Sequence, residues 1–409
     1  GDQFAYRPMQ AACRDIVLPD KGPVLAIIED ETGSGKTEAA LVLAHRLLKT
    51  GRGRGLYFAL PTMATADAMF RRIAGSLHRI MANVSLALAH GRAGESEEFR
   101  ALVRKSGDTE TRTDEVGCSG WLAESRRRAL LADVGVGTVD QALMAVLPVR
   151  HQALRHFGLS SKIIIVDEVH EVGEPYIAEE LIALLRMHRA AGGSAILLTA
   201  TLPLLLREKL LATYGGESAS AAYPALTIAG GAKITTFPGE KRARRGAVTV
   251  RRCSSGDGAI QLIAEGVDRG AACAWIRNSV DDAIASAAEL CRLGIDAKVL
   301  HARFALGDRK CLENEILARA GRDSEGERRK GLVVIGTQIL ESSLDLDFDL
   351  MISDIAPIAA IVQRAGRLWR HMDVRPAGSR PYPVPTLHIL CPDPEKVTDA
   401  NWLQDTLGL

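Results

Sequence analysis

The chain has 409 residues, of which 47% are hydrophobic but only 4% aromatic, so it is long enough for two or three domains with aliphatic cores. Lys and Arg together number 51 against 50 Asp and Glu, so bulk charge gives no sign of a nucleic-acid binder, and any basic track must be local. The seven cysteines lack the close spacing of a zinc or redox motif, and no apolar run is long enough to span a membrane, so we expect a cytoplasmic protein with reduced thiols.

Short aliphatic runs alternate with amphipathic helical stretches such as 37–50 and 280–294. Continuous apolar runs of this kind are typical of parallel strands that are covered on both faces. They predict strands at 24–30, 55–61, 162–168, 194–201, 271–277, 296–302, 331–337, 350–356 and 386–392. The alternation of strands and helices predicts an α/β protein with two doubly wound parallel sheets in tandem.

The predicted strands form two groups, separated by a stretch that is rich in Gly, Ala and Ser and then basic. We predict a first domain over 1–225, a linker over 226–250, a second domain over 251–395, and the start of a truncated C-terminal region over 396–409. Two hydrophilic stretches, 91–120 and 320–331, are expected to be a surface insertion and a mobile loop.

Residues 29–41, EDETGSGKTEAAL, follow a predicted strand and open a predicted helix. The glycines let the backbone curl so that its N–H groups face a phosphate, Lys36 can reach the β- and γ-phosphates, and Thr37 can bind Mg²⁺. The full phosphate-loop pattern has Gly where this chain has Asp30. A glycine-rich helix cap without a ligand is the alternative, but the strand before and the helix after favour a nucleotide site. The candidate nucleotide contacts are Thr32, Gly33, Ser34, Gly35, Lys36 and Thr37.

Residues 163–172, IIIVDEVHEV, place two carboxylates at the end of a wholly apolar strand. Ionised carboxylates avoid dry surroundings unless a cation pairs with them, and ligands of open α/β sheets gather at the carboxyl ends of strands. We therefore predict that Asp167 holds the hydrated Mg²⁺ of a nucleotide, Glu168 polarises the attacking water, and His170 senses the nucleotide state. The alternative, an acidic helix cap on a solvated face, fits DEVH alone but not the apolar strand before it.

Together with TATLP at 199–203, these two segments resemble the helicases of superfamily 2. The resemblance implies two RecA-like domains, with ATP and Mg²⁺ as cofactors, and it implies that Thr199 and Thr201 couple hydrolysis to movement. In that superfamily a Gln ahead of the first strand reads adenine. Gln10, in YRPMQ at 6–10, is the candidate, and a buried capping Gln is the alternative.

The second half continues the resemblance in two segments, GTQILESSLDLDFDLMISD at 336–354 and QRAGRLWRH at 363–371. The resemblance implies that Thr337 touches nucleic acid and that Asp345 faces the nucleotide. Gln363 would orient the water or the γ-phosphate, and Arg367 and Arg370 would act as arginine fingers from the second domain, so that hydrolysis depends on closure. The alternative is a basic helix face laid on a phosphate backbone.

Loops at the strand ends of both domains are expected to supply the nucleic-acid contacts. Hydroxyls, amides and helix N-termini grip phosphates without reading sequence, which suits a motor that must move on. Three candidates lie in 135–144, which we predict to be a turn before a helix. Individually such residues are more often structural, but as a set at the superfamily's spacing they indicate a track. Besides Thr337, the candidates are Thr62, Arg71, Thr138, Asp140, Gln141 and Arg303.

Residues 121–171, with 32–41, 88–93 and 363–371, resemble a narrower family, the type I CRISPR-associated helicase–nuclease, and the resemblance covers about residues 4–395. It implies an ATP-dependent translocase that moves 3′ to 5′ on single-stranded DNA marked by the Cascade surveillance complex. It also implies a metal-dependent HD nuclease domain. That domain would need a His and, further along, a His-Asp pair within apolar helical segments, and these 409 residues contain no such pattern. We expect no nuclease activity from this chain alone, and a separate HD nuclease as a partner.

Two alternatives stay open on the sequence. An RNA helicase or a DNA-repair translocase of the same superfamily would carry the same motifs, because phosphate-gripping loops do not distinguish the sugar. An ATP-gated DNA clamp or docking module would bind both ligands without moving along a strand, but the intact Glu168 and the two arginines speak against it.

Overall fold

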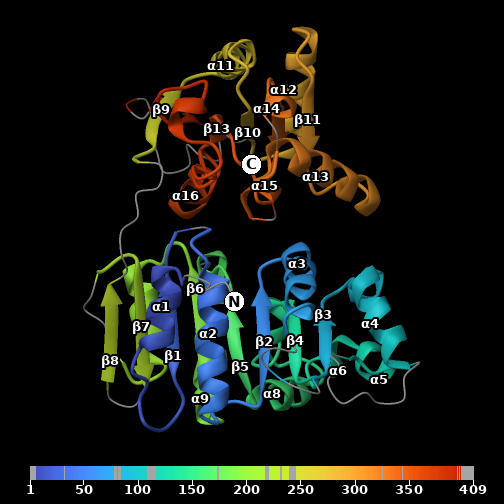
Figure 1. The fold of residues 1–409 in the computed structure, drawn as a ribbon, viewed down its shortest axis with the longest axis vertical. Helices are drawn as coiled ribbons and strands as arrows, with labels where there is room; N and C mark the ends of the chain where they lie inside the picture. Colours follow the sequence, from blue (N-terminus) through green and yellow to red (C-terminus); the bar gives the residue numbers. More distant parts are fainter. Residues whose placement is uncertain are drawn as a thin grey trace. The chain divides into compact units, whose positions relative to one another are not determined.

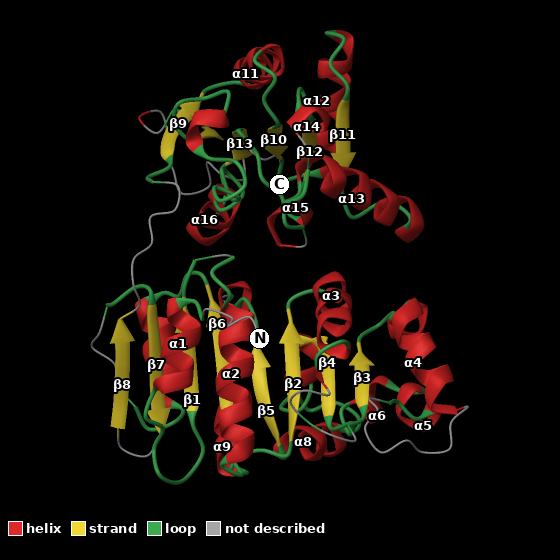
Figure 2. Cartoon of the chain, in the orientation of Figure 1, coloured by secondary structure: helices red, strands yellow, loops and turns green. Residues whose placement is uncertain are grey.

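The chain divides into two compact units, Gly1–Lys241 and Arg242–Leu409. Each unit contains one sheet with helices packed on it (Figures 1 and 2). The predicted α/β class with two tandem sheets is therefore confirmed. Among the residues described below, no helix combines the length and the apolar character of a membrane span. This computed structural model describes residues 6–31, 33–77, 81, 84–107, 117–172, 175–216, 221–230, 233–238, 246–324, 326–342, 344–393, 395 and 397.

The first unit contains an eight-stranded sheet in the order β3-β4-β2-β5-β6-β1-β7-β8. Neighbours among β1 to β6 run parallel, whereas β7 pairs antiparallel with both β1 and β8. The four strands predicted in this unit, at β1, β2, β5 and β6, are confirmed. The strands are β1 (Leu25–Glu29), β2 (Gly55–Leu60), β3 (Leu86–Ala89), β4 (Val134–Thr138), β5 (Lys162–Val166), β6 (Ala195–Thr199), β7 (Ala225–Gly230) and β8 (Lys233–Pro238).

Helices cover both faces of this sheet. They are α1 (Pro8–Asp15), α2 (Lys36–Lys49), α3 (Met63–Ala74), α4 (Glu97–Gly107), α5 (Gly120–Ala123), α6 (Arg126–Ala129), α7 (Val139–Leu143), α8 (Gln152–Ser160), α9 (Pro175–Ala190) and α10 (Leu204–Ala212), with short 3₁₀ turns η2 (Ala93–Glu95) and η3 (Val169–Val172). The insertion predicted over 91–120 begins with η2 and α4. The ring of Phe99 on α4 meets Phe70 of α3 edge-on at 5.6 Å, so this part of the insertion is docked. Residues 108–116 of the insertion lie outside the described residues.

The linker predicted over 226–250 is wrong in its first half. β7 and β8 form an antiparallel hairpin there, and β7 also pairs with β1 over Ala225–Ala229. All six residues of β7 are buried, so the Ala- and Gly-containing ALTIAG sequence is an inner strand rather than a connection. Its small side chains lowered the apolar signal by which the other strands were predicted.

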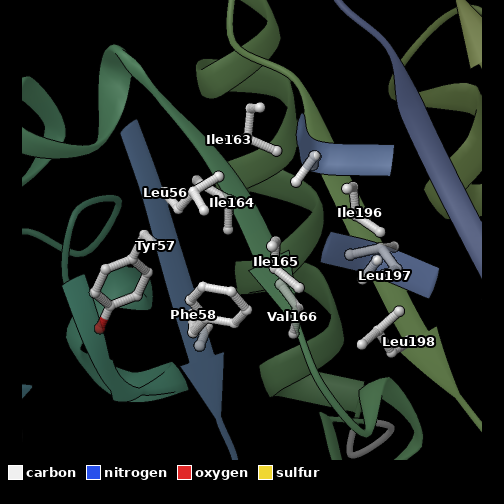
Figure 3. Packing of buried hydrophobic residues seen from close by; sticks show 14 of the residues in the cluster. Leu56, Tyr57, Phe58, Ile163, Ile164, Ile165, Val166, Ile196, Leu197 and Leu198 are labelled. Carbon is white, nitrogen blue, oxygen red and sulfur yellow. The ribbon is translucent and has the colours of Figure 1, made fainter. Parts of the chain in front are cut away.

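The centre of the first sheet is dry, as Figure 3 shows for β2, β5 and β6. Ile163, Ile164, Ile165 and Val166 are at most 1% exposed. Burying such a side chain stabilises the fold by about 1.5–3 kcal/mol relative to leaving it in water. β5 is therefore fixed from both faces, and the chain leaves it at Asp167 from a rigid end.

The second unit contains a six-stranded sheet in the order β11-β12-β10-β13-β14-β9, with all pairs parallel. Its strands are β9 (Thr249–Cys253), β10 (Cys273–Ile276), β11 (Ala297–Leu300), β12 (Val333–Gly336), β13 (Leu350–Asp354) and β14 (Thr386–Leu390). Its helices are α11 (Gly256–Asp268), α12 (Val280–Arg292), α13 (Leu306–Ala320), α14 (Gly326–Arg329), α15 (Ile339–Ser342) and α16 (Ile358–Ala365), with a 3₁₀ turn η4 (Ala377–Ser379).

All five strands predicted in the second unit are confirmed, and among the strands described there β9 alone was not predicted. The mobile loop predicted over 320–331 is wrong in part, because α14 forms within it and Arg329 is only 5% exposed. Most of the other polar residues described in this stretch are exposed, but Arg329 is buried with acidic partners, and this anchors the segment.

Candidate functional site

One edge of the first sheet carries the predicted site segments of this unit. The parallel strands β4, β2, β5, β6 and β1 all end there, in that spatial order. β5 leads into the acidic pair, β6 into the segment 199–201, and β1 into the loop 30–35. The coupling segment therefore lies between the acidic pair and the loop, and the candidate nucleic-acid residues follow β2 and β4 on the other side of β5 (Figure 1).

The loop between β1 and α2 has the backbone of a phosphate loop. Gly33 and Gly35 have φ angles of 83° and 96°, a left-handed conformation that favours glycine. The buried ammonium of Lys36 donates to the carbonyl oxygens of Asp30 at 2.9 Å and Glu31 at 3.0 Å. Lys36 is therefore folded back over the loop. Asp30 contacts Lys36 through its backbone carbonyl, and its carboxylate accepts from the N–H of Glu31 at 2.8 Å.

Two further predicted residues of the loop are accounted for, and one is not. The hydroxyl oxygen of Ser34 is buried and has no hydrogen-bond partner in the described part of the chain. Thr37 is in the first turn of α2, next to Lys36. Thr32 lies outside the described residues.

The first helix packs against this loop. Arg7 donates from Nη1 to the carbonyl of Gly33 at 2.8 Å, and the Oε1 of Gln10 accepts from the backbone N–H of Arg7 at 3.0 Å. A Cβ at Gly35 would lie 2.7 Å from Nε2 of Gln10, so Gln10 would have to move, and the φ of 96° would strain any residue other than glycine. Gln10, predicted to read adenine, is thus placed beside the phosphate loop. Tyr6, at the same end of the chain, is half exposed under the guanidinium of Arg14.

The two carboxylates after β5 are held close together. The backbone N–H of Asp167 donates to Ala59 at 3.0 Å, and Asp167 accepts from the N–H of Glu168 at 3.0 Å. Glu168 has φ 50°, which is uncommon for a residue with a side chain and marks a constrained turn. Burial, and next the charge of Glu168, raise the pKa of Asp167 to about 7, whereas the field of Lys36 opposes the rise. Without a further cation, its surroundings therefore favour the protonated form of Asp167 more than water does.

A hydrogen-bonded chain joins the acidic segment to β6. Nδ1 of His170 lies 3.2 Å from Oγ1 of Thr199 and 3.4 Å from Oε2 of Glu168. The hydroxyl of Thr199 donates to the carbonyl of Thr201 at 2.6 Å and accepts from its N–H at 3.2 Å. Burial lowers the pKa of His170, although Glu168 opposes it, so the imidazole is neutral at pH 7. The three residues predicted to couple hydrolysis to movement are thus in direct contact.

The candidate nucleic-acid residues of the first unit differ in accessibility. Thr62 caps α3 by accepting from the N–H of Thr65 at 3.2 Å, and Arg71 on the same helix is exposed. Asp140 is exposed in the first turn of α7, while Thr138, which precedes that helix, is 7% exposed.

Gln141 has to be corrected as a nucleic-acid contact. It is 4% exposed, and its side-chain oxygen accepts from Nη1 of Arg155 on α8 at 3.0 Å. Because a helix turn puts Gln141 on the inner face of α7, the amide pairs with a buried guanidinium instead of facing solvent.

In the second unit, the predicted residues lie at the carboxyl ends of β11 and β12 and around α16. Arg303, after β11, is exposed and paired with Asp281 at 2.7 Å, whereas Thr337, after β12, is 5% exposed. Asp345 forms an ion pair with Nε of Arg370 at 2.5 Å. The residue expected to face the nucleotide and one expected arginine finger are therefore partners here.

The other predicted residues of the arginine motif are buried in the second unit. Gln363 is 6% exposed, and Arg367, at 4%, donates to the carbonyl of Glu341. Arg364, at 1%, donates to Glu341 at 2.8 Å and to Ser353 at 2.7 Å, so it joins α16 to α15 and β13. Arg364 thus anchors the motif, and all three guanidinium groups of the motif have protein partners in this structure.

Sequence reasoning missed a buried ion pair beside the phosphate loop. Glu29, the last residue of β1, accepts from Nη1 of Arg207 on α10 at 2.9 Å, and both side chains are at most 5% exposed. Burial raises the pKa of Glu29, and the arginine opposes the rise. A carboxylate inside an aliphatic strand was the only sequence signal, and it does not identify the partner 178 residues away.

Comparison with known proteins places these motifs in a family. Residues 7–208 match the family of DEAD/DEAH box helicases, and residues 269–373 match the C-terminal family of the CRISPR-associated nuclease/helicase Cas3. The chain is 36% identical over 410 residues to the CRISPR-associated endonuclease/helicase Cas3 of Escherichia coli (strain K12), an alignment that covers 95% of this chain and 45% of that protein. The chain belongs to the Cas3 family. It spans about half the length of the relatives that it matches.

Solved Cas3 structures share the fold of both units. The crystal structure of T. fusca Cas3-ADP matches with a TM-score of 0.84 at 32% identity, covering 97% of this chain and 47% of that one. A chain of a CRISPR RNA-guided surveillance complex, pre-nicking, matches with a TM-score of 0.73 at 29% identity, covering 98% and 46%. The prediction of tandem RecA-like domains of the Cas3 type is therefore confirmed.

Proposed function

We propose that this chain is a nucleic-acid-dependent ATPase that moves 3′ to 5′ along single-stranded DNA in type I CRISPR interference. The observation that carries the proposal is the meeting of Lys36 and the acidic pair at one sheet edge. The ammonium lies over a glycine loop, and its field acts on the buried Asp167 from the end of another strand of that edge. A cation and a carboxylate in this arrangement suit a metal–triphosphate complex.

Three features of the residues fit such a ligand. The hydroxyl of Ser34 is buried without a hydrogen-bond partner in the described residues, and so is Oε2 of Glu168. Gly33 and Gly35 have left-handed φ angles of 83° and 96°, which let the loop curl as a phosphate-binding backbone does. The carboxylate of Asp167 and the hydroxyl of Thr37 are both oxygen ligands, which Mg²⁺ prefers.

Each residue then has a role that follows from its place. Bound Mg²⁺–ATP supplies the phosphoryl group and the divalent charge. Lys36 would exchange two loop carbonyls for phosphate oxygens, and Asp167, with Thr37, would hold the metal as an ionised carboxylate. Glu168 holds the attacking water and accepts its proton. His170 would pass the state of Glu168 to Thr199, because its Nδ1 lies 3.4 Å from Oε2 of Glu168 and shares a hydrogen bond with the hydroxyl of Thr199.

We assign the arginine motif of the second unit to the same reaction. Arg367 and Arg370 would leave their protein acceptors and stabilise the charge that develops on the phosphoryl group, with Gln363 and Asp345 beside them. Since both guanidinium groups are paired in this structure, hydrolysis would require a rearrangement of these pairs. The exposed Arg71, Asp140 and Arg303 and the helix-capping Thr62, with Thr138 and Thr337, would lie along the DNA.

The proposed partner is the Cascade surveillance complex, with nuclease activity supplied by a separate HD domain. It is supported by the solved surveillance complex that holds a chain 29% identical to this one. Within the described residues, no group of three or more His, Cys, Asp or Glu side chains is arranged to hold a metal ion. Incubating the chain alone with DNA and divalent metals tests the expectation, drawn from the sequence, that it does not cut DNA.

The test is ATP turnover by the 409-residue chain with and without single-stranded DNA. Glu168→Gln should bind ATP but lose at least about 100-fold of the stimulated rate, because proton acceptance is lost. Glu179→Gln, an exposed carboxylate paired with Lys209, is the control and should keep the rate of the original chain. Direction is measured by displacement of streptavidin from strands that carry biotin at the 3′ or the 5′ end.

Each other outcome favours a different function. Undiminished turnover by Glu168→Gln would remove the ATPase assignment. Stronger stimulation by matched RNA would favour an RNA helicase of the same superfamily. Binding of ATP and DNA without streptavidin displacement would favour an ATP-gated clamp.

A further inference from the structure

A buried cluster of charged residues surrounds the backbone of Arg370. Asp347 is 0% exposed and Asp349 is 3% exposed. Asp347 accepts from Nε of Arg375 at 2.7 Å and from Arg380 at 3.0 Å. Asp349 accepts from Arg380 at 2.9 Å and pairs with Arg329 at 2.9 Å. We call these five residues the Asp347 cluster.

The cluster joins parts of the chain that are far apart in sequence. Arg329 comes from α14, and Arg375 and Arg380 come from the segment after the arginine motif. Arg375 also donates to the carbonyl of Gly321 at 2.9 Å and to the hydroxyl of Ser324 at 3.2 Å. Because a buried carboxylate needs partners of this quality, the cluster fixes these loops relative to one another.

Asp347 reaches directly into the arginine motif. The segment before β13 runs beside it, with the N–H of Phe348 donating to Arg367 at 2.9 Å and the N–H of Trp369 donating to Phe348 at 3.0 Å. The next contact in this ladder is the N–H of Arg370, which donates to the carboxylate of Asp347 at 2.9 Å. The side chain of Asp347 thus continues the backbone ladder at Arg370, the residue whose guanidinium is predicted to act.

The backbone immediately before Arg370 is in an unfavourable conformation. Trp369 has φ 49°, a genuine outlier for a bulky residue. It persists only if its surroundings fix it. Two contacts do so: the guanidinium of Arg380 lies 5.3 Å from the Trp369 ring centre, and Asp347 holds the following N–H.

We propose that Asp347 is a positioning residue for Arg370: it holds the backbone of that residue in the turn from which its guanidinium acts on the phosphoryl group. Arg375 and Arg380 keep the carboxylate ionised and in place. Asp345 holds the guanidinium head in this structure, so two acids of the LDLDFD segment share one arginine. This inference rests on the proposed ATPase function.

The test is a double-mutant cycle on DNA-stimulated ATP turnover. Arg375 is at the margin of the cluster, so Arg375→Ala loosens Asp347 without emptying its site. It should lower kcat about tenfold and change KM for ATP less than about threefold, because a positioned arginine acts in the transition state. Arg370→Ala should lower kcat at least about 100-fold, and adding Arg375→Ala to it should change the rate less than about twofold further. Asp347→Asn is measured in the same cycle, and Arg375→Lys should recover part of the rate.

Arg309→Ala is the matched control, since Arg309 pairs with Glu313 at 2.8 Å on α13 and does not touch the cluster. It should retain kcat. If the losses from Arg375→Ala and Arg370→Ala multiply in the double variant, Asp347 does not act through Arg370 and the proposal is overturned, although the ATPase function stands. A wild-type chain without stimulated turnover overturns both.

A measurement on the unchanged chain covers variants that do not fold. The amide hydrogen of Arg370 should exchange as slowly as that of Trp369, within about tenfold, when single amides are resolved by electron-transfer fragmentation. Rapid exchange at Arg370 beside a protected Trp369 would show that Asp347 does not hold this N–H, and it would overturn the proposal.

Discussion

Protonation of Asp167 should control the binding of Mg²⁺–nucleotide to this chain. Burial and the neighbouring Glu168 raise the pKa of Asp167 to about 7. About one molecule in ten therefore carries the ionised carboxylate at pH 6, and about nine in ten at pH 8. Binding that needs this carboxylate should strengthen about tenfold between these pH values, equivalent to about 1.4 kcal/mol.

The assay is an equilibrium titration with Mg²⁺ and a fluorescent, non-hydrolysable ATP analogue at pH 6, 7 and 8 and constant ionic strength. Asp167→Asn is the reference, because it keeps the titration of the nucleotide itself but has no carboxylate to protonate. The ratio of the two affinities isolates the contribution of Asp167.

Glu168→Gln gives the assay a predicted direction. It removes the like charge that contributes to the raised pKa of Asp167, so the midpoint of the pH dependence should move to lower pH. The reasoning is refuted if the affinity ratio between the original chain and Asp167→Asn is the same at pH 6 and pH 8. It is also refuted if Glu168→Gln moves the midpoint upward.

Two further predictions concern coupling and stability. Thr199→Val removes the hydroxyl between His170 and the 199–201 turn, so streptavidin displacement should fall at least about tenfold while ATP turnover stays within about threefold. The control is Thr213→Val, at a buried residue whose hydroxyl donates to the helix carbonyl of Leu210. Equal losses of both activities in Thr199→Val would contradict coupling. Arg207→Leu leaves Glu29 buried and unpaired, so it should lower the free energy of unfolding, measured with denaturant, by about 3–5 kcal/mol. The double variant with Glu29→Leu should recover at least half of this loss. A loss below about 1 kcal/mol would contradict the importance of this pair.

The sequence predicted the inner strands well because their apolar runs are continuous, and it failed where packing demands small residues. β4, VGVGT, was predicted as part of a turn because of its glycines. A Cβ at Gly135 would lie 2.8 Å from the ring of Tyr57, and one at Gly137 would lie 2.3 Å from the carbonyl of Ala89. These glycines make room for neighbours in the sheet, and one sequence does not separate this use from a turn.

The site shows the same division between local and distant information. Motif spacing correctly placed Lys36, Asp167 and Thr199 at one sheet edge, because strand order follows from a known α/β arrangement. Gln141 and Arg367 were predicted to face ligands but are buried against protein partners: Gln141 accepts from Arg155, and Arg367 donates to the carbonyl of Glu341. Which face of a short helix or turn points inward depends on contacts with other segments, and a motif does not specify them.

Two buried aspartates show how the proposed metal site differs from a structural cluster in this protein. Asp347 has several arginines around it, and although burial alone would raise its pKa, their hydrogen bonds and charges hold that pKa below its ordinary value. Asp167 has a second carboxylate beside it and only the field of nearby cations, so its pKa is raised. A permanent internal partner would stabilise Asp167 but would also compete with any cation arriving with a nucleotide. An uncompensated acid at a rigid strand end is therefore the arrangement expected where the missing positive charge is to come and go with each turnover.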